Sequence, residues 1–261
     1  MVRALLDRGE QVRALVRDGA GSLPEGVARA VGDLNRPDTL TAHLDDVDAV
    51  FLLSGYDGLE QTLADMRNAG VGRVVLLSSS AAPGGDLSNA VARYHILSEQ
   101  AVRESGLAWT FLRPNSFMSN ALRWRPQLHA GDVVRLPFAD VAVASIDPDD
   151  LGAVAAAALT EPGHQGRAYR LSGPQSLRPA EQVAIVGRAL GRELRFEAQS
   201  DEEARAEMSR SMPPEYVEAF MRFFAEGDVD ESAVLPTVAE LTGRQPRSFE
   251  RWASAHSEDF Q

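Results

Sequence analysis

The sequence predicts an α/β protein with a doubly wound parallel sheet, and three observations support this. Candidate strands and candidate helices alternate through the first 114 residues. No hairpin signal joins two neighbouring strands, so consecutive strands are expected to run parallel with helices on both faces. Several strands, such as residues 74–77, are continuous apolar runs, which are typical of strands buried on both faces.

The elements of this first part follow from apolar runs and from the residues that end them. Helices are expected at residues 1–8, 37–44, 57–69 and 88–105, and strands at residues 11–17, 27–31, 47–53, 73–77 and 107–112. Gly9, Gly70 and Gly106 follow three of the helices, since glycine readily adopts the left-handed conformation at a helix end. Pro37 is expected at a first helical position, Asp57 is expected to cap the next helix, and Pro114 ends the last strand.

The alternation is looser after residue 120. Helices are expected at residues 121–129, 148–159 and 179–190, short strands at residues 133–136, 141–145, 168–171 and 194–198, and mostly helix from residue 201 onward. The loop at residues 115–120 follows a buried strand. In an open parallel sheet, ligands bind outside the carboxyl ends of the strands, so this loop is expected at a ligand site.

Composition narrows the class of protein. The 261 residues include no cysteine, which excludes disulfides, thiolate catalysis and zinc–cysteine sites. The net charge of −12 argues against nucleic-acid binding, and no apolar run is long enough to span a membrane. The charged N-terminal residues do not form a signal peptide, so a cytoplasmic protein is expected. The histidines show no metal-ligand spacing, and no metal is predicted.

Several phrases in a fixed order carry a family likeness over nearly the whole chain. They are residues 13–17, 32–34, 47–53, 69–79, His95 with Glu99, residues 105–114 with Phe117 and Asn120, residues 146–151, 169–174 and 249–260. In these phrases the chain resembles the NmrA-like branch of the atypical short-chain dehydrogenase/reductases. The resemblance implies a Rossmann-like NAD(P)-binding domain at residues 1–114. It also implies a mixed substrate-binding lobe at residues 115–261, with some segments returning to the sheet.

The resemblance further implies an NAD(P)H-binding oxidoreductase that reduces a small quinone or carbonyl acceptor, with oligomers possible. Two alternatives stay open: a non-catalytic protein that senses NADP(H), as NmrA itself does, and a chain that binds no cofactor. One departure is large, because the first strand and glycine-rich loop of the family are missing. That strand is central in the family, between residues 11–17 and 47–53. Two inner strand edges are therefore expected to be unpaired, the natural protein is expected to start upstream, and cofactor binding is expected to suffer.

The resemblance assigns the adenosine side of the cofactor to residues that end the early strands. Arg17 would pair with a 2′-phosphate, which favours NADP(H) over NAD(H). Asp33 and Leu34 would hold the adenine, while Ser54 and Gly55 would let the cofactor approach closely. Each assignment has an alternative. Arg17 would face solvent, Asp33 would accept a hydrogen bond from the backbone of its own turn, and Ser54 and Gly55 would only form a turn.

The nicotinamide side is assigned to later residues. Ser78 would face the nicotinamide, and Pro114, Asn115 and Phe117 would cover it and open the substrate pocket. The tyrosine–lysine pair of typical short-chain reductases is missing, because Ser98 stands four residues after Tyr94. His95 would hold the ribose or donate a proton, the alternative being a histidine satisfied within the fold. Trp109 is expected in the core, and Trp124 and Phe138 in the core or the pocket wall.

Overall fold

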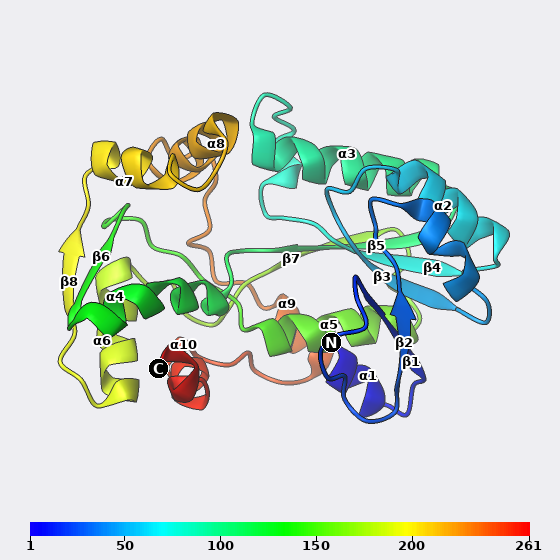
Figure 1. Cartoon of the computed structure of the whole chain (residues 1–261), viewed down its shortest axis with the longest axis horizontal. Coiled ribbons are helices and arrows are strands. Elements are labelled where there is room, and N and C mark those ends of the chain that lie inside the picture. Colours follow the sequence, from blue (N-terminus) through cyan, green and yellow to red (C-terminus); the bar gives the residue numbers. More distant parts are fainter.

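The computed structural model describes residues 1–261 and has the expected parallel α/β architecture (Figure 1). The strands of its N-terminal half alternate with helices and short 3₁₀ turns. They are β1 (Val12–Val16), β2 (Val27–Val31), β3 (Ala49–Leu53), β4 (Arg73–Leu77) and β5 (Ala108–Pro114). The helices are α1 (Val2–Leu6), α2 (Leu59–Asn68) and α3 (Ala90–Glu104). The periodic apolar pattern therefore placed every early strand correctly.

The strands divide into two parallel sheets at the expected position. One sheet has the order β3-β4-β5-β7, and β1 pairs only with β2. β1 and β3 are not hydrogen-bonded to each other, which confirms that two strand edges stay unpaired. Leu15 in β1 and Leu53 in β3 are 39% and 38% exposed, high values for apolar residues within strands.

Helices cover both faces of the four-stranded sheet. α5 (Pro148–Thr160) and α9 (Thr237–Thr242) pack on one face, where Val75 and Leu112 point, and α1 packs against α5 and β1. α2 and α3 pack on the other face against Val74, Leu76 and Phe111. Successive strand residues point to opposite faces, so each apolar run serves both layers.

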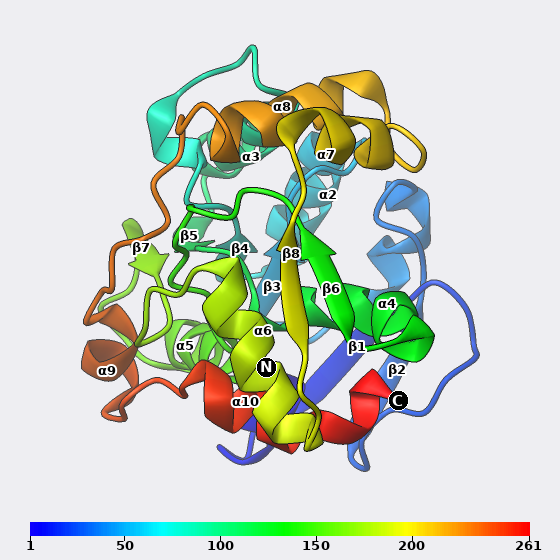
Figure 2. The same cartoon turned by 90° about the vertical axis from the view of Figure 1, so that its left-hand side faces the viewer.

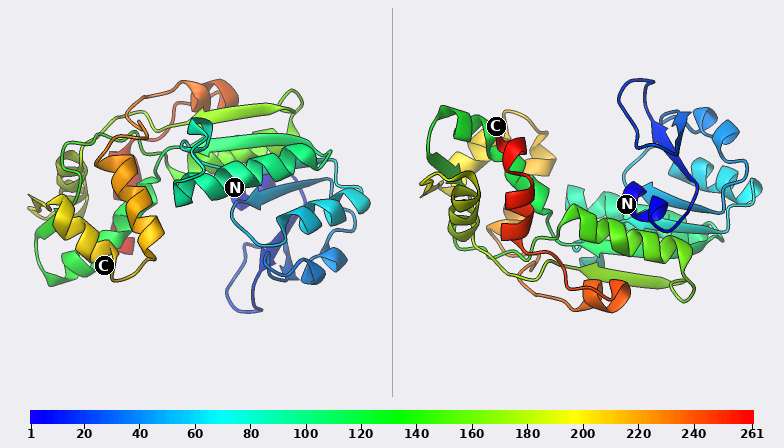
Figure 3. Two further views of the ribbon diagram at one scale, coloured as in Figure 1. Left: turned by 90° about the horizontal axis from the view of Figure 1, so that it is seen from above. Right: turned by 90° about the horizontal axis from the view of Figure 1, so that it is seen from below.

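The second half of the chain forms a lobe and also returns to the sheet. β7 (Arg167–Leu171) pairs parallel with β5, with Tyr169 opposite Leu112. The lobe contains α4 (Arg125–Ala130), β6 (Val133–Leu136), α6 (Pro179–Leu190), β8 (Arg195–Ala198), α7 (Asp201–Met208), α8 (Pro214–Phe224) and α10 (Phe249–Ala255). Figure 2 shows β6 and β8 side by side, flanked by α6 and α4, and Figure 3 shows the lobe at one end of the long axis with the sheet at the other.

Three expected elements were wrong in detail. Residues 37–44 form two 3₁₀ turns, Pro37–Thr39 and Thr41–His43, because so short a segment without a side-chain cap does not offset the cost of nucleating an α-helix. Gly58, not Asp57, caps α2. The expected strand at residues 141–145 is reduced to one bridge between Val143 and Leu177, since no neighbouring strand continues the pairing. No helix combines the length and apolar character needed to cross a bilayer.

Candidate functional site

The carboxyl ends of three neighbouring strands meet at one edge of the four-stranded sheet. Leu53 lies opposite Leu77, and Leu77 lies opposite Leu112, so the residues after them are aligned. Ser54 Oγ donates a hydrogen bond to the carbonyl of Leu77 (2.6 Å). The backbone N–H of Ser78 donates to the carbonyl of Leu112 (2.8 Å). The structure thus brings the expected strand-end residues of β3, β4 and β5 together.

Arg17, Asp33 and Leu34, which are expected at the adenosine, follow the strands of the separate two-stranded sheet. Arg17 follows β1, is exposed, and makes no hydrogen bond or ion pair. Asp33 follows β2, and its Oδ1 accepts a hydrogen bond from the backbone N–H of Asn35 (2.9 Å). Leu34 packs against the apolar cluster beneath α2. Asp33 therefore accepts a hydrogen bond from its own turn, as expected if it only stabilises that turn. The guanidinium of Arg17, in contrast, has no partner within the chain.

Gly55 is a point of close approach, and the structure places an aromatic ring there. Its φ of 86° lies in the left-handed region, and a Cβ built on it would stand 2.9 Å from the ring of Tyr94. Its N–H donates to Ser98 Oγ (3.1 Å). Ser98, which occupies the place of the missing lysine, thus joins α3 to the end of β3.

A buried carboxylate holds the ends of β4 and β5 to α3. Glu99, only 2% exposed, accepts hydrogen bonds from Arg113 Nε (2.8 Å) and Nη2 (2.6 Å), Ser78 Oγ (2.7 Å) and Arg103 Nη2 (2.9 Å). Burial pushes the pKa of Glu99 upward, but the bonds from Arg113 and Ser78 and the two positive charges outweigh it and hold the pKa below its usual value. The hydroxyl of Ser78 is committed to this network and does not point freely outward.

His95 lies one turn before Glu99 on α3 and is neutral at neutral pH. Burial lowers its pKa to about 4, although the charge of Glu99 opposes the shift. Its Nδ1 is buried and has no hydrogen-bond partner. Because an unpaired N–H is costly to bury, we infer that the proton resides on Nε2. His95 then offers an N–H donor through Nε2.

The His95 pKa makes a testable prediction. We expect its imidazole resonance in NMR spectra to titrate near pH 4, with the other four histidines as references in the same sample. Between about pH 4 and the ordinary value of 6.5, the unfolded chain binds a proton that folded His95 does not, so this residue makes stability fall as pH falls. Titration of His95 near 6.5 would contradict the prediction.

A second buried carboxylate ties the lobe to the sheet edge, and sequence reasoning missed it. Glu231 accepts hydrogen bonds from Ser80 Oγ (2.6 Å) and Ser116 Oγ (2.6 Å), and its carbonyl accepts one from Asn115 Nδ2 (2.9 Å). Asn115 is therefore a structural bridge in this structure, and Pro114 is buried as the last residue of β5. Glu231 lies in a loop more than one hundred residues further on, and no local pattern marks it.

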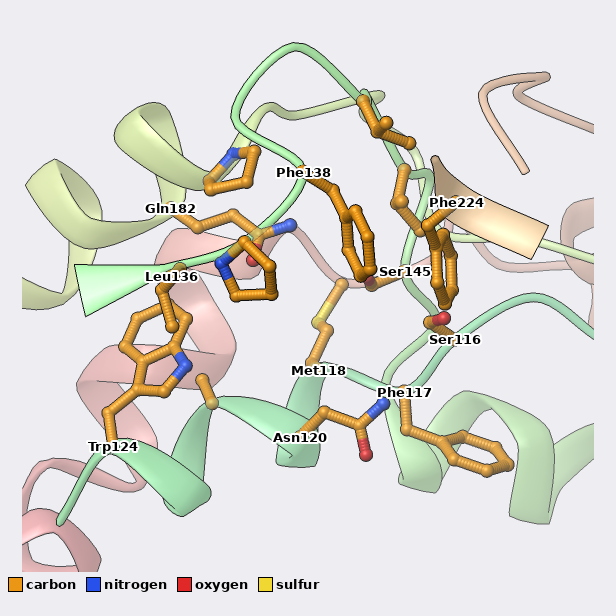
Figure 4. Close-up of a pocket in the computed structure, with 15 residues that line it drawn as sticks. Ser116, Phe117, Met118, Asn120, Trp124, Leu136, Phe138, Ser145, Gln182 and Phe224 are labelled. Carbon is orange, nitrogen blue, oxygen red and sulfur yellow. The ribbon is translucent and has the colours of Figure 1, made fainter. Parts of the chain in front are cut away.

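A pocket with a volume of about 190 Å³ opens beside this bridge, between β5 and the lobe. Its walls are mainly apolar and aromatic, and none of the lining side chains is charged. They are Ser116, Phe117, Met118, Asn120, Ala121, Trp124, Leu136, Pro137, Phe138, Val141, Val143, Ser145, Pro179, Gln182 and Phe224. Figure 4 shows the rings of Phe138 and Phe224 above Met118, with Ser116 and Ser145 close by. Phe117, Trp124 and Phe138 thus all lie on the pocket wall.

Comparison with known proteins identifies a family match and several similar proteins. The sequence profile of a family described as NAD(P)H-binding matches residues 1–162. The chain is 42% identical over 263 residues to (4-alkanoyl-5-oxo-2,5-dihydrofuran-3-yl)methyl phosphate reductase of Streptomyces griseus subsp. griseus, covering 99% of this chain and 90% of that protein. It is 36% identical over 271 residues to NAD(P)H azoreductase of Xenophilus azovorans, covering 100% and 94%. The NADPH-dependent quinone oxidoreductase of Escherichia coli, complexed with NADPH, superposes with a TM-score of 0.78 at 22% identity, covering 97% of this chain and 94% of that one.

Proposed function

This chain belongs to the NAD(P)H-binding oxidoreductases of the NmrA-like, atypical short-chain type, and on that premise we propose that it reduces a small, uncharged, planar acceptor with NADPH. A quinone, an azo compound or a conjugated carbonyl compound fits this description. The observation that carries the proposal is the aromatic pocket at the carboxyl end of β5, whose lining holds no charged side chain. The reaction would draw on a cytoplasmic pool of NADPH.

The size of the pocket supports the acceptor class. An apolar cavity of about 150 Å³ is known to bind benzene, so about 190 Å³ accommodates one ring or a compact pair. Asn120 and Ser145, whose side chains make no hydrogen bond within the chain, supply polar groups that would orient a carbonyl or azo nitrogen. A few polar groups in an apolar wall are what a neutral conjugated acceptor requires.

We assign residues of this chain to the two ends of a nicotinamide dinucleotide. When bound, the cofactor supplies the hydride. Arg17 carries a free guanidinium that would pair with a 2′-phosphate, which is why we propose NADP(H) in preference to NAD(H). His95 would offer its Nε2–H to the ribose or the nicotinamide side.

The role of His95 can be separated into hydrogen bonding and proton donation. With a pKa of about 4, it is neutral when the enzyme works near neutral pH, so we expect it to orient the bound molecule through Nε2–H. His95→Gln keeps an N–H donor and should retain kcat/KM within about threefold, whereas His95→Ala should lose about tenfold, the worth of one net hydrogen bond. If both variants lose about a hundredfold or more, His95 acts as a general acid instead.

Turnover assays test the proposed function directly. NADPH and NADH oxidation would be followed with a benzoquinone, a naphthoquinone, an azo dye and a conjugated enone, beside a fluorescence titration of each nucleotide without acceptor. We expect NADPH to be oxidised faster than NADH at equal concentration, with at least one planar acceptor turned over catalytically. Binding of NADPH with no oxidation by any acceptor would refute the reductase.

One observation favours a second candidate, a protein that binds NADP(H) and senses it without turnover. Neither Tyr94 nor His95, the two candidate proton donors on α3, readily gives up a proton near neutral pH. Burial raises the pKa of Tyr94, and Ser98 rather than lysine stands four residues later. The same titration and turnover pair distinguishes the candidates, since a sensor binds the nucleotide and leaves every acceptor unreduced.

A further inference from the structure

Phe138 has an unfavourable backbone conformation for an aromatic residue. Its φ is +56°, and only one other non-glycine residue, Asp46, has a positive φ (59°). Aspartate tolerates the left-handed region because its short polar side chain bonds locally, but a bulky ring gains nothing there. Strain of this kind persists only where the surroundings impose it, and it concentrates at ligand sites.

The surroundings of Phe138 do not explain the strain as core packing. The residue is half-buried and belongs to none of the four apolar core clusters. Its carbonyl accepts a hydrogen bond from the N–H of Val141 (3.0 Å), which closes a tight turn after β6. That turn directs the side chain to the pocket, where it forms part of the wall.

The ring of Phe138 completes an aromatic surface that begins on α8. Its centroid lies 5.3 Å from that of Phe224, with an angle of 33° between the rings. Phe220 stacks behind Phe224 at 6.4 Å and does not line the pocket. Figure 4 shows the two wall rings facing the space over Met118. A flat conjugated molecule in this space would lie against ring faces on one side and the thioether of Met118 on the other.

We propose that Phe138 is a specificity-determining residue that selects planar acceptors by stacking, and that the strained turn exists to present its ring. The inference rests on the proposed function and deepens it, because it names planarity as the selected property. It makes a prediction that a structural residue would not share. Removing the ring should weaken binding of a planar acceptor and leave a small non-planar one unaffected.

The test uses Phe138→Gly, Phe138→Leu and two matched controls. For Phe138→Gly we expect KM for a naphthoquinone to rise about tenfold, as the loss of an aromatic contact in a pocket implies. We expect KM for a small cyclic enone with a puckered ring and a gem-dimethyl group, which cannot lie flat against Phe138, to change less than about twofold. We expect the melting temperature not to fall, since glycine relieves the positive φ. Phe138→Leu keeps the apolar bulk without a flat face and should raise the naphthoquinone KM as well.

The controls separate the loss of stacking on Phe138 from two other effects of the substitution, the relief of a positive φ and the loss of an aromatic ring from the protein. Asp46→Gly relieves the other positive φ on an exposed loop and should leave both KM values unchanged. Phe220→Leu removes a ring of the same aromatic group that does not line the pocket, and should likewise leave them unchanged.

One measurement keeps this inference independent of turnover. Binding of an oxidised naphthoquinone to the protein without nucleotide reports acceptor affinity through quenching of tryptophan fluorescence, and its Kd should rise about tenfold in Phe138→Gly. If the wild type reduces no acceptor, but binds the quinone about tenfold more tightly than Phe138→Gly does, the proposed function fails and the inference stands. Equal effects on planar and non-planar ligands, or no effect on either, would overturn it.

Discussion

Replacing Glu99 with alanine is expected to lower the free energy of unfolding at pH 7 by about 3–5 kcal/mol, because it leaves a buried guanidinium without its partner. The side chain of Arg113 is only 16% exposed, and both of its bonds to a carboxylate end on Glu99. Ser78 would lose its acceptor at the same time. Since a domain is stable by about 5–15 kcal/mol, urea denaturation should show the change plainly.

The pH dependence of this loss identifies the carboxylate charge as its cause. The pKa of Glu99 is lower in the folded protein than its ordinary value of 4.5, so its contribution is complete above that value and is lost as pH falls through the folded pKa. The difference between wild type and Glu99→Ala should therefore shrink as the pH falls below 4.5. Glu104→Ala, an exposed carboxylate on the same helix, should cost less than about 0.5 kcal/mol at any pH. If Glu99→Ala lowered the free energy of unfolding by the same amount at every pH, Glu99 would stabilise the protein through packing and not through its charge.

Most of the fold could be predicted because its strands are buried on both faces. Such strands read as continuous apolar runs, and β4 and β5 are recognisable without any knowledge of their neighbours. The resemblance also predicted that β1 and β3 do not pair with each other, because a further strand lies between these two in the family. The errors at residues 37–44 and 141–145 arose where tertiary contacts decide whether a short segment becomes an α-helix, a 3₁₀ turn or a bridge.

The candidate site was less predictable, because its key contacts join distant segments. Strand ends marked Ser54 and Ser78, but the sequence did not reveal that Ser78 would be committed to Glu99. Glu231 reaches Ser116 across 115 residues of chain, and Phe224 meets Phe138 from another element. The course of the loops brings these distant side chains together, and the local periodicity of the sequence does not encode that course.

Arg17→Glu is expected to weaken NADPH binding by about 10–100-fold while leaving NADH binding within about threefold. A charge-assisted hydrogen bond contributes about 1.5–3 kcal/mol, and each 1.4 kcal/mol is a factor of ten in affinity. Arg17 has no intramolecular partner to lose, so the substitution removes only a contact with the nucleotide. A glutamate in this position can instead accept hydrogen bonds from ribose hydroxyls, which favours the cofactor without the 2′-phosphate.

Fluorescence titration with both nucleotides measures this preference in wild type and variant. Arg251→Glu is the matched control, because Arg251 is also exposed and its side chain makes no ion pair, but it lies on α10 in the lobe. Net charge changes equally in the two variants, so a general repulsion of phosphate by an already acidic protein would affect both. Weakened NADPH binding in Arg17→Glu alone would assign the 2′-phosphate to the end of β1. An equal loss of NADH and NADPH in that variant would instead mean that Arg17 supports the sheet and does not read the phosphate.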